Sequence, residues 1–342
     1  MFTLRQYLLA LLDSRGLTRT LGEIDVCRDE QGRPCFSAGN SAAVFRIRLG
    51  GRIRSLRCYL RPMRHLKEIY GQRLLEKELY LHTSPETGVW VDTVLGDWIE
   101  GSTLHETVAQ AAALRDRECL QILVRLFDRL ALALVTDDRA HGDLKPENII
   151  VGDDGTLCPI DFDASYLPAF AGEISPELGT AAYQHPARTA ADFDERIDDY
   201  PAALISTALH ALAENPTLWD RYGSSDGLLY TPQRIASDPA YRETLALFEK
   251  RGMAVQYRIA QLLTAPTLRL FGLAELLAEA VREKPAARSG TEAETPELFV
   301  ENGRWGYRTA ERVVVAPLYD NGFDFTEGLA AVQLGGTWHY ID

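Results

Sequence analysis

The stretch "HGDLKPENII", residues 141–150, places three charged side chains and an asparagine between two apolar segments. The segment before it, "LQILVRLFDRLALALV" (120–135), has apolar residues at helical spacing, and the segment after it, "TLCPIDFDA" (156–164), reads as a buried strand. Catalytic side chains often lie on polar loops that rigid elements support. The pattern therefore predicts a functional loop rather than an ordinary solvated turn.

The residue types in this loop suit phosphoryl transfer. Asp143 and Asn148 lie five residues apart, and Asp161 follows thirteen residues after Asn148. Phosphoryl transfer requires divalent metal at the phosphates, a carboxylate at the attacking hydroxyl and positive charge on the moving group. Asn148 and Asp161 supply oxygen ligands that suit Mg²⁺. Asp143 is predicted to orient the hydroxyl and accept its proton, and Lys145 to neutralise the γ-phosphate.

Composition narrows the class of protein. The 342 residues carry a net charge of −13, which argues against nucleic acid or an anionic membrane as a partner. No apolar run approaches the roughly 20 residues that span a bilayer, and the N-terminal segment lacks a secretion-signal pattern. The five cysteines never occur as CxxC, and the histidines are scattered. These features predict a reduced, cytoplasmic protein without disulfides or a zinc site.

Periodicity divides the chain into five segments. Two strands are expected at "SAAVFRIRL" and "RIRSLRCYL" around a Gly50-Gly51 turn, followed by a helix over 64–82. From 104 to 284 the pattern is mostly helical, and "KPAARSGTEAETPE" has the composition of a linker. The predicted segments are an N-terminal helix (1–20), a strand-rich unit (21–101), a helical unit (102–284), a linker (285–297) and a β-rich tail (298–342).

The motif "HGDLKPEN" followed by "IDFD" resembles the catalytic loop and metal-binding triplet of protein-kinase-like enzymes. Six matching positions by chance have a probability of order 10⁻⁸ per start site. "LGTAAYQHP" (178–186) resembles the segment that positions a protein substrate, and Asp198 in "IDDYPAALISTALHAL" resembles the Asp that braces the catalytic loop. The resemblance covers residues 21 to about 284 and implies a two-lobed α+β fold with a β-rich N-lobe and a helical C-lobe.

The same resemblance implies a nucleotide site that uses ATP and Mg²⁺. Gly39 and Val44 fall at the spacing of a Gly-rich phosphate loop, although Ser37 and Ala42 replace two of its glycines. Arg57 occupies the position of the usual phosphate-binding Lys, and Glu76, nineteen residues later, is its expected partner on the following helix. The backbone near Asp97 and Ile99 is expected to meet the adenine edge.

Departures from the family pattern leave three interpretations open. Arginine at position 57 is not a conservative replacement for lysine, Asp163 replaces the Gly of the metal triplet, and Gly142 replaces an Arg. An active kinase that phosphorylates Ser or Thr of a protein, a nucleotide-binding pseudokinase scaffold and a small-molecule kinase similar to aminoglycoside or choline phosphotransferases all fit "HGD" with a metal motif. The segment "LGTAAYQHP" favours a protein substrate.

The tail resembles the WG repeat, a short β unit that is usually an interaction module. The match is carried by Trp305, Gly306, Tyr307, Pro317, Tyr319, Phe325, Glu327, Gly328, Leu329 and Ala330. A second unit begins at "GGTWHYID", where His339 replaces the second Gly. Its aromatic side chains are expected to pack as core. The tail is expected to dock on the helical lobe or a neighbouring copy, or to recruit a partner or substrate protein.

Overall fold

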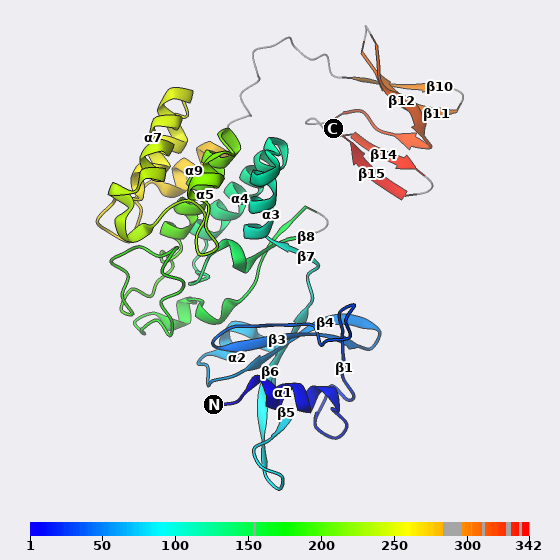
Figure 1. Ribbon diagram of the computed structural model, residues 1–342, viewed down its shortest axis with the longest axis vertical. Coiled ribbons are helices and arrows are strands. Elements are labelled where there is room, and N and C mark those ends of the chain that lie inside the picture. Colours follow the sequence, from blue (N-terminus) through cyan, green and yellow to red (C-terminus); the bar gives the residue numbers. More distant parts are fainter. Residues whose placement is uncertain are drawn as a thin grey trace. The chain divides into compact units, whose positions relative to one another are not determined.

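A computed structural model describes residues 1–152, 155–282, 296–301, 303–309, 312–325, 330–334 and 337–341. The chain divides into two compact units, Met1–Glu283 and Lys284–Asp342. The first unit contains a strand-rich part followed by a helical part, and the second contains short strands (Figure 1). The mixed helix-and-sheet architecture expected from the sequence is confirmed. None of the described helices is long and apolar enough to cross a membrane.

The strand-rich part is one antiparallel sheet in the order β1-β3-β4-β6-β5, with β2 also paired to β3. Its strands are β1 (Asp25–Val26), β2 (Phe36–Ala38), β3 (Ala42–Leu49), β4 (Arg52–Tyr59), β5 (Leu74–His82) and β6 (Gly88–Asp97). The predicted hairpin is present as β3 and β4. Its turn residues Gly50 and Gly51 both have positive φ, 54° and 80°, as tight hairpin turns require.

The N-terminal helix α1 (Leu4–Leu12) begins with a capping box between Thr3 and Gln6. Its buried side chains, Tyr7, Ala10 and Leu11, belong to the same apolar cluster as the inward-facing residues of β3, β4 and β5. This helix therefore packs against the strand-rich part.

The predicted helix over 64–82 is wrong. The chain forms only the short helix α2 (Leu66–Tyr70) and the 3-10 turn η1 (Gly71–Arg73) before β5 begins at Leu74. Gly71, with a φ of 53°, ends the helix. The residues from 74 onward pair with β6, and the buried Glu78 accepts hydrogen bonds from the backbone of Thr20 and Leu21. These tertiary contacts override the local leucine spacing.

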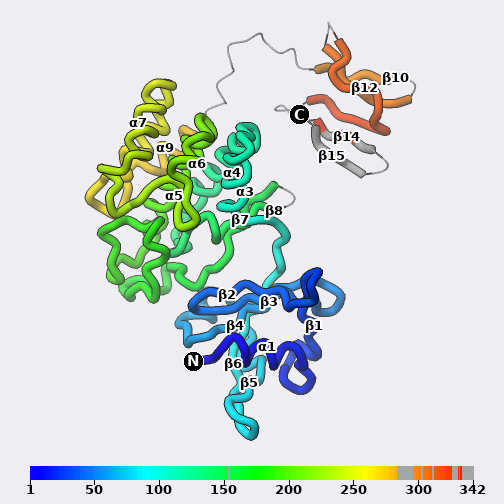
Figure 2. The backbone as a smooth tube through the Cα atoms, in the orientation of Figure 1, coloured from blue at the N-terminus to red at the C-terminus, as the bar shows by residue number. Residues whose placement is uncertain are grey.

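The helical part starts after residues 98–100, which lead from β6 into β7 (Figure 2). A small sheet of β7 (Gly101–Thr103), β8 (Ile149–Gly152) and β9 (Leu157–Pro159) carries the loop of interest. The helices are α3 (Leu104–Leu114), α4 (Arg117–Thr136), α5 (Asp199–Glu214), α6 (Leu218–Tyr222), α7 (Pro239–Arg251), α8 (Ala254–Leu262) and α9 (Leu273–Arg282), and the 3-10 turns are η2 (Pro146–Asn148), η3 (Phe162–Ala164), η4 (Pro168–Phe170) and η5 (Pro232–Ser237). Helix α5 is buried over nearly its whole length and packs against α4 and α8 at the centre of this part.

The second unit is built from two three-stranded antiparallel sheets. These are β10 (Glu297–Glu301), β11 (Arg304–Arg308) and β12 (Val313–Tyr319), then β13 (Asn321–Gly322), β14 (Ala330–Leu334) and β15 (Thr337–Ile341). Tyr307 is fully buried, and its ring packs edge-on against that of Phe325, with the two ring centroids 4.9 Å apart. Core packing of the aromatic residues is thus confirmed for these two; Glu327, Gly328 and Leu329 lie outside the described residues.

Candidate functional site

The loop that follows α4 is held by a buried carboxylate at the start of α5. Asp198 accepts hydrogen bonds from the backbone N–H of His141 and, at 3.0 Å, of Gly142. Burial raises the pKa of Asp198, and the hydrogen bonds from these two backbone N–H groups oppose that rise. The predicted bracing role of Asp198 is therefore present in the structure.

The other side of the loop is fixed by His141. Its Nε2 donates to the carbonyl oxygen of Ile160 at 2.8 Å, which leaves Nδ1 to accept from the backbone N–H of Asp143. The ring thus links the loop to the residue just before Asp161. Two buried contacts, one to α5 and one to the segment after β9, set the position of Asp143.

Gly142 has a φ of 81°, a conformation that glycine adopts without strain. A Cβ built on it would lie 2.1 Å from the carbonyl oxygen of Ala164. No larger residue fits this position without a backbone shift, so the arginine that the kinase pattern commonly carries here is excluded by this loop geometry.

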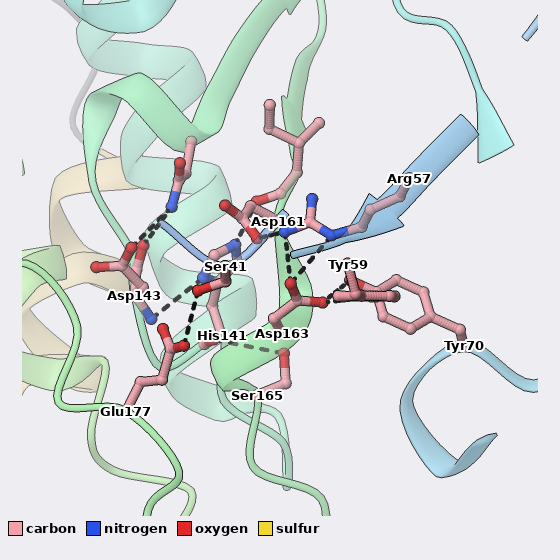
Figure 3. A network of polar contacts seen from close by, with 12 residues as sticks. Ser41, Arg57, Tyr59, Tyr70, His141, Asp143, Asp161, Asp163, Ser165 and Glu177 are labelled. Carbon is pink, nitrogen blue, oxygen red and sulfur yellow. Dashed lines mark hydrogen bonds and ion pairs between the residues drawn. The ribbon is translucent and has the colours of Figure 1, made fainter. Parts of the chain in front are cut away.

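Asp143 lies at the centre of a set of polar contacts (Figure 3). Its Oδ2 accepts from the Asn148 side-chain amide at 3.2 Å and pairs with Lys145 Nζ at 3.2 Å. Its Oδ1 accepts from the backbone N–H of Thr180 at 2.6 Å, and Lys145 donates to the Thr180 hydroxyl at 2.8 Å. The structure therefore brings Asp143, Lys145 and Asn148 together with the segment predicted to position a protein substrate.

Asn148 and Asp161 are the residues that could take part in a magnesium site. The amide nitrogen of Asn148 faces Asp143, at 2.9 Å from its carbonyl oxygen, so the amide oxygen is directed elsewhere. Asp161, in the left-handed conformation with φ 68°, has a side chain that is 40% exposed and is accessible to a ligand. Within the described ranges no group of three or more His, Cys, Asp and Glu side chains is placed to hold a metal. One amide and one carboxylate oxygen fit Mg²⁺ whose remaining ligands are phosphate oxygens and water.

The predicted ion pair between Arg57 and Glu76 is wrong. Glu76 lies on β5, is exposed, and pairs with Lys67 at 3.3 Å. Arg57, on β4, instead points toward η3 and pairs with both Asp161 and Asp163 (Figure 3). Because the long helix expected over 64–82 does not form, its acidic partner is not delivered to Arg57, and carboxylates from the helical part take its place.

Asp163 is the best-satisfied acidic side chain in this network. It is 4% exposed and accepts from Arg57 Nε at 3.0 Å, from the Tyr59 hydroxyl at 3.0 Å and from the Tyr70 hydroxyl at 2.6 Å. From the sequence, Asp163 was noted only as a replacement for the Gly of the metal triplet, and no role was predicted for the two tyrosines. Tyr59 lies two residues after Arg57 and so shares its face of β4, a signal available in the sequence.

Burial lowers the pKa of Arg57, but the charges of Asp161 and Asp163 outweigh it and hold that pKa above its usual value. Burial also raises the pKa of Tyr59 and of Tyr70, and the negative charge of Asp163 adds to the rise. The network is therefore a charged arginine between two carboxylates, with both tyrosines protonated and donating.

The remaining predicted nucleotide residues lie around the sheet. Gly39 is in the turn between β2 and β3, and Val44 on β3 is the register partner of Arg57 on β4. Asp97 ends β6 and pairs with Arg54 at 3.1 Å, and Ile99 follows in the connection to β7. Val44 thus lies beside Arg57 in the sheet, Gly39 lies in the β2–β3 turn, and Asp97 and Ile99 lie where the strand-rich part leads into the helical part.

A set of contacts at the turn after β2 was not predicted from the sequence. Ser41 donates to Glu177 at 3.0 Å (Figure 3). Arg61 contacts Ser41 at 2.7 Å and pairs with Glu177. Glu177 comes from the segment that precedes Thr180. The sheet and this segment are thus joined by charged groups beside the site, and their sequence separation gives no local signal.

Comparison with known proteins agrees with these observations at a coarse level. The chain is 28% identical over 172 residues to CBL-interacting protein kinase 17 of Oryza sativa subsp. japonica, which covers 48% of this chain and 35% of the rice protein. It is 28% identical over 219 residues to the serine/threonine-protein kinase PknL of Mycobacterium tuberculosis, covering 59% of this chain and 52% of that protein. The chain therefore spans about a third to a half of the length of these relatives.

Residues 308–338 match the family model of the WG containing repeat. The matched range begins just after Trp305, Gly306 and Tyr307 and includes β12, β13 and β14. Both resemblances drawn from the sequence are thus confirmed: the chain carries a WG repeat at residues 308–338 and is similar, at low identity, to serine/threonine-protein kinases.

Proposed function

We propose that the first unit has a two-lobed protein-kinase-like fold and transfers a phosphoryl group from ATP to Ser or Thr of a protein. The observation that carries this proposal is the contact set of Asp143, Lys145, Asn148 and Thr180. The sheet order, with β3, β4, β6 and β5 as neighbours in a strand-rich part that is followed by a mostly helical part, supports it. So does the similarity to serine/threonine-protein kinases.

Each residue of the site has a role in this proposal. Asp143 orients the attacking hydroxyl and accepts its proton, while Lys145 neutralises the γ-phosphate and ties Asp143 to the substrate segment through Thr180. Gly39 and Val44 cover the phosphates, Arg57 contacts them, and the backbone of Asp97 and Ile99 meets the adenine. Mg²⁺, held by Asn148 and Asp161, would screen the charge of the phosphates.

The contact of Thr180 with both Asp143 and Lys145 favours a protein substrate over a small molecule. The segment 178–186 is then an integral part of the site rather than a passing loop. A catalytically silent, nucleotide-binding scaffold remains the second candidate, because Arg57 pairs with Asp161, the proposed metal ligand.

The decisive experiment is incubation with labelled ATP and Mg²⁺ together with a generic protein substrate. We expect Asp143→Asn to reduce transfer by about 10²–10⁴, the usual effect of losing a positioned general base. Asp13→Asn, an exposed carboxylate that pairs with Arg15, is the matched control and should leave the rate unchanged. Equal rates in wild type and Asp143→Asn would contradict the proposal, and ATP binding without any transfer by wild type would favour the scaffold.

We further propose that the second unit is an interaction or docking module. Its described residues expose five large apolar side chains, Val300, Val313, Val314, Leu318 and Phe323, at 44–60%. We infer that some of these exposed side chains form a surface that binds another protein. Chemical cross-linking of wild type and of Leu318→Asp tests this, and undiminished cross-linking of the variant would contradict it.

A further inference from the structure

The network around Asp163 shows which group holds Arg57. Oδ2 of Asp163 receives two nitrogens of the guanidinium, Nε at 3.0 Å and Nη2 at 2.5 Å. Its Oδ1 receives the hydroxyls of Tyr59 and Tyr70 (Figure 3). A carboxylate whose two oxygens are both engaged from several sides has little freedom to move, and it fixes the orientation of the guanidinium that it binds.

The two acidic partners of Arg57 differ in burial. The Asp161 side chain is 40% exposed, whereas that of Asp163 is 4% exposed. Breaking the buried pair would leave an uncompensated charge away from water, which is costly. The exposed pair can open at little cost, because water replaces the lost contact. Arg57 is therefore anchored by Asp163 and only loosely held by Asp161.

We infer that Asp163 is a positioning residue that keeps the Arg57 guanidinium at the phosphate site when Asp161 turns to the metal. The inference rests on the proposed nucleotide site. The sequence pattern placed the acidic partner of Arg57, Glu76, on a helix between β4 and β5. In this inference the partner is Asp163, which lies two residues after the proposed metal ligand Asp161. The tyrosines at 59 and 70 hold the anchor itself, one from β4 and one from α2.

The inference makes a prediction with a definite sign. Asp163 places a negative charge near the triphosphate, so removing that charge would by itself strengthen ATP binding. If Asp163 also anchors Arg57, its removal frees the guanidinium to pair with Asp161 alone. The phosphates then lose a positioned cation, and Mg²⁺ must compete with Arg57 for Asp161. The second effect should exceed the first, because a charge-assisted hydrogen bond held in place is stronger than a screened repulsion.

The test measures Mg²⁺-dependent ATP binding by calorimetry in wild type, Asp163→Asn, Arg57→Met and the double variant. Asp163→Asn should weaken ATP binding about tenfold and raise the Mg²⁺ concentration needed for half-saturation. In the Arg57→Met background the same substitution should cause no loss and should slightly strengthen binding. Asp25→Asn, which removes an exposed partner of Arg48 in the same sheet, is the control and should change nothing.

Equal or tighter ATP binding by Asp163→Asn in the presence of Arg57 would overturn the inference and leave the proposed function standing. A wild type that binds no ATP would overturn both. Melting temperatures measured without nucleotide show whether each variant folds. The double variant should have a higher melting temperature than Arg57→Met, because it no longer buries an unpaired carboxylate. If Arg57→Met does not fold, Arg57→Lys is used in its place. In that background Asp163→Asn should weaken ATP binding less than it does in wild type. An equal loss of ATP affinity in the two backgrounds would overturn the inference.

Discussion

Gly142 shows how one residue constrains the proposed catalytic loop. With a φ of 81° and the carbonyl oxygen of Ala164 2.1 Å from any added Cβ, it carries both a backbone and a steric requirement. The residues on either side, His141 and Asp143, make the contacts that hold the loop and carry its chemistry. A side chain at position 142 would therefore push the loop away from η3, which carries Asp163.

We expect Gly142→Ala to lower the free energy of unfolding by about 3 kcal/mol or more and to abolish transfer. Gly172→Ala is a matched control, because Gly172 has a φ of 86° but no atom within 4 Å of an added Cβ. It should cost about 1–2 kcal/mol, the backbone term alone. Urea denaturation of both variants gives the difference, and equal losses would show that the contact with Ala164 is unimportant.

At the residue scale the sequence predicted the loop side chains well because their spacing is local. Asp143, Lys145 and Asn148 lie within six residues, and the contacts among them follow from one turn. The partner of Arg57 could not be predicted in the same way, because Asp161 and Asp163 are more than 100 residues away in sequence. Which carboxylate reaches a given arginine depends on the packing of the two parts of the unit.

At the scale of elements, helix α5 begins with two adjacent buried acids that have different tasks. Asp198 faces the proposed catalytic loop, while Asp199 accepts from the backbone N–H of Leu270 at 3.1 Å. Burial raises the pKa of Asp199 to about 6, although the hydrogen bond from Leu270 and the nearby Arg196 oppose the rise. The folded protein therefore binds a proton on Asp199 more tightly than the unfolded chain does.

This shift predicts a pH dependence of stability. The unfolded chain loses the Asp199 proton near pH 4 and the folded protein near pH 6, so the free energy of unfolding falls as pH rises between these values. Above pH 6 the free energy of unfolding is lower by about 2–3 kcal/mol than it is below pH 4. Asp199→Asn keeps an acceptor for Leu270 and has no proton to lose. We expect it to stabilise the first unit by that order at pH 8 and by little at pH 4.

Urea denaturation at the two pH values checks this prediction. The exposed Asp13→Asn should give no such gain, because the neighbouring Arg15 lowers the pKa of Asp13 instead of raising it. A stability difference between Asp199→Asn and wild type that does not grow from pH 4 to pH 8 would contradict the assignment.

Elements differ in how well their patterns predict them. The β3–β4 hairpin follows from alternating apolar residues and two glycines, and α4 follows from apolar spacing over twenty residues. The helix predicted over 64–82 is wrong because the leucines of this segment fit helical spacing, whereas its backbone from Leu74 onward pairs with β6. Gly71 is a local signal in the sequence against a continuous helix. The positive φ of Lys77, 51°, where the register of β5 shifts, is seen only in the structure.

For the whole molecule, the division into two units means that the second unit has an apolar core of its own. The described core of the second unit is small: Tyr307, Ala330 and Val332 are buried, with Phe325 packed against them. Gly306 is needed beside it, because an added Cβ would lie 2.7 Å from the carbonyl oxygen of Val315. The Trp-Gly-Tyr sequence thus combines a close backbone approach with the central side chain of the unit.

Separate cores predict separate unfolding. Tyr307 is fully buried, and its hydroxyl donates to the carbonyl oxygen of Phe323 at 2.7 Å. Tyr307→Ala should therefore destabilise the second unit by about 3–5 kcal/mol, the usual cost of removing a buried aromatic ring. The melting of the first unit and its ATP affinity should not change. Scanning calorimetry of the intact chain, with Glu297→Ala as an exposed control in the same unit, measures both transitions.

The result also identifies what the exposed apolar residues of the second unit bind. If Tyr307→Ala lowers only the second transition, the two units do not stabilise each other, and the docking proposed for Val313, Val314 and Leu318 would need another molecule. A parallel fall in the melting temperature of the first unit would contradict that prediction. It would mean that the second unit binds to the rest of its own chain, since a contact that stabilises both partners is lost when either one unfolds.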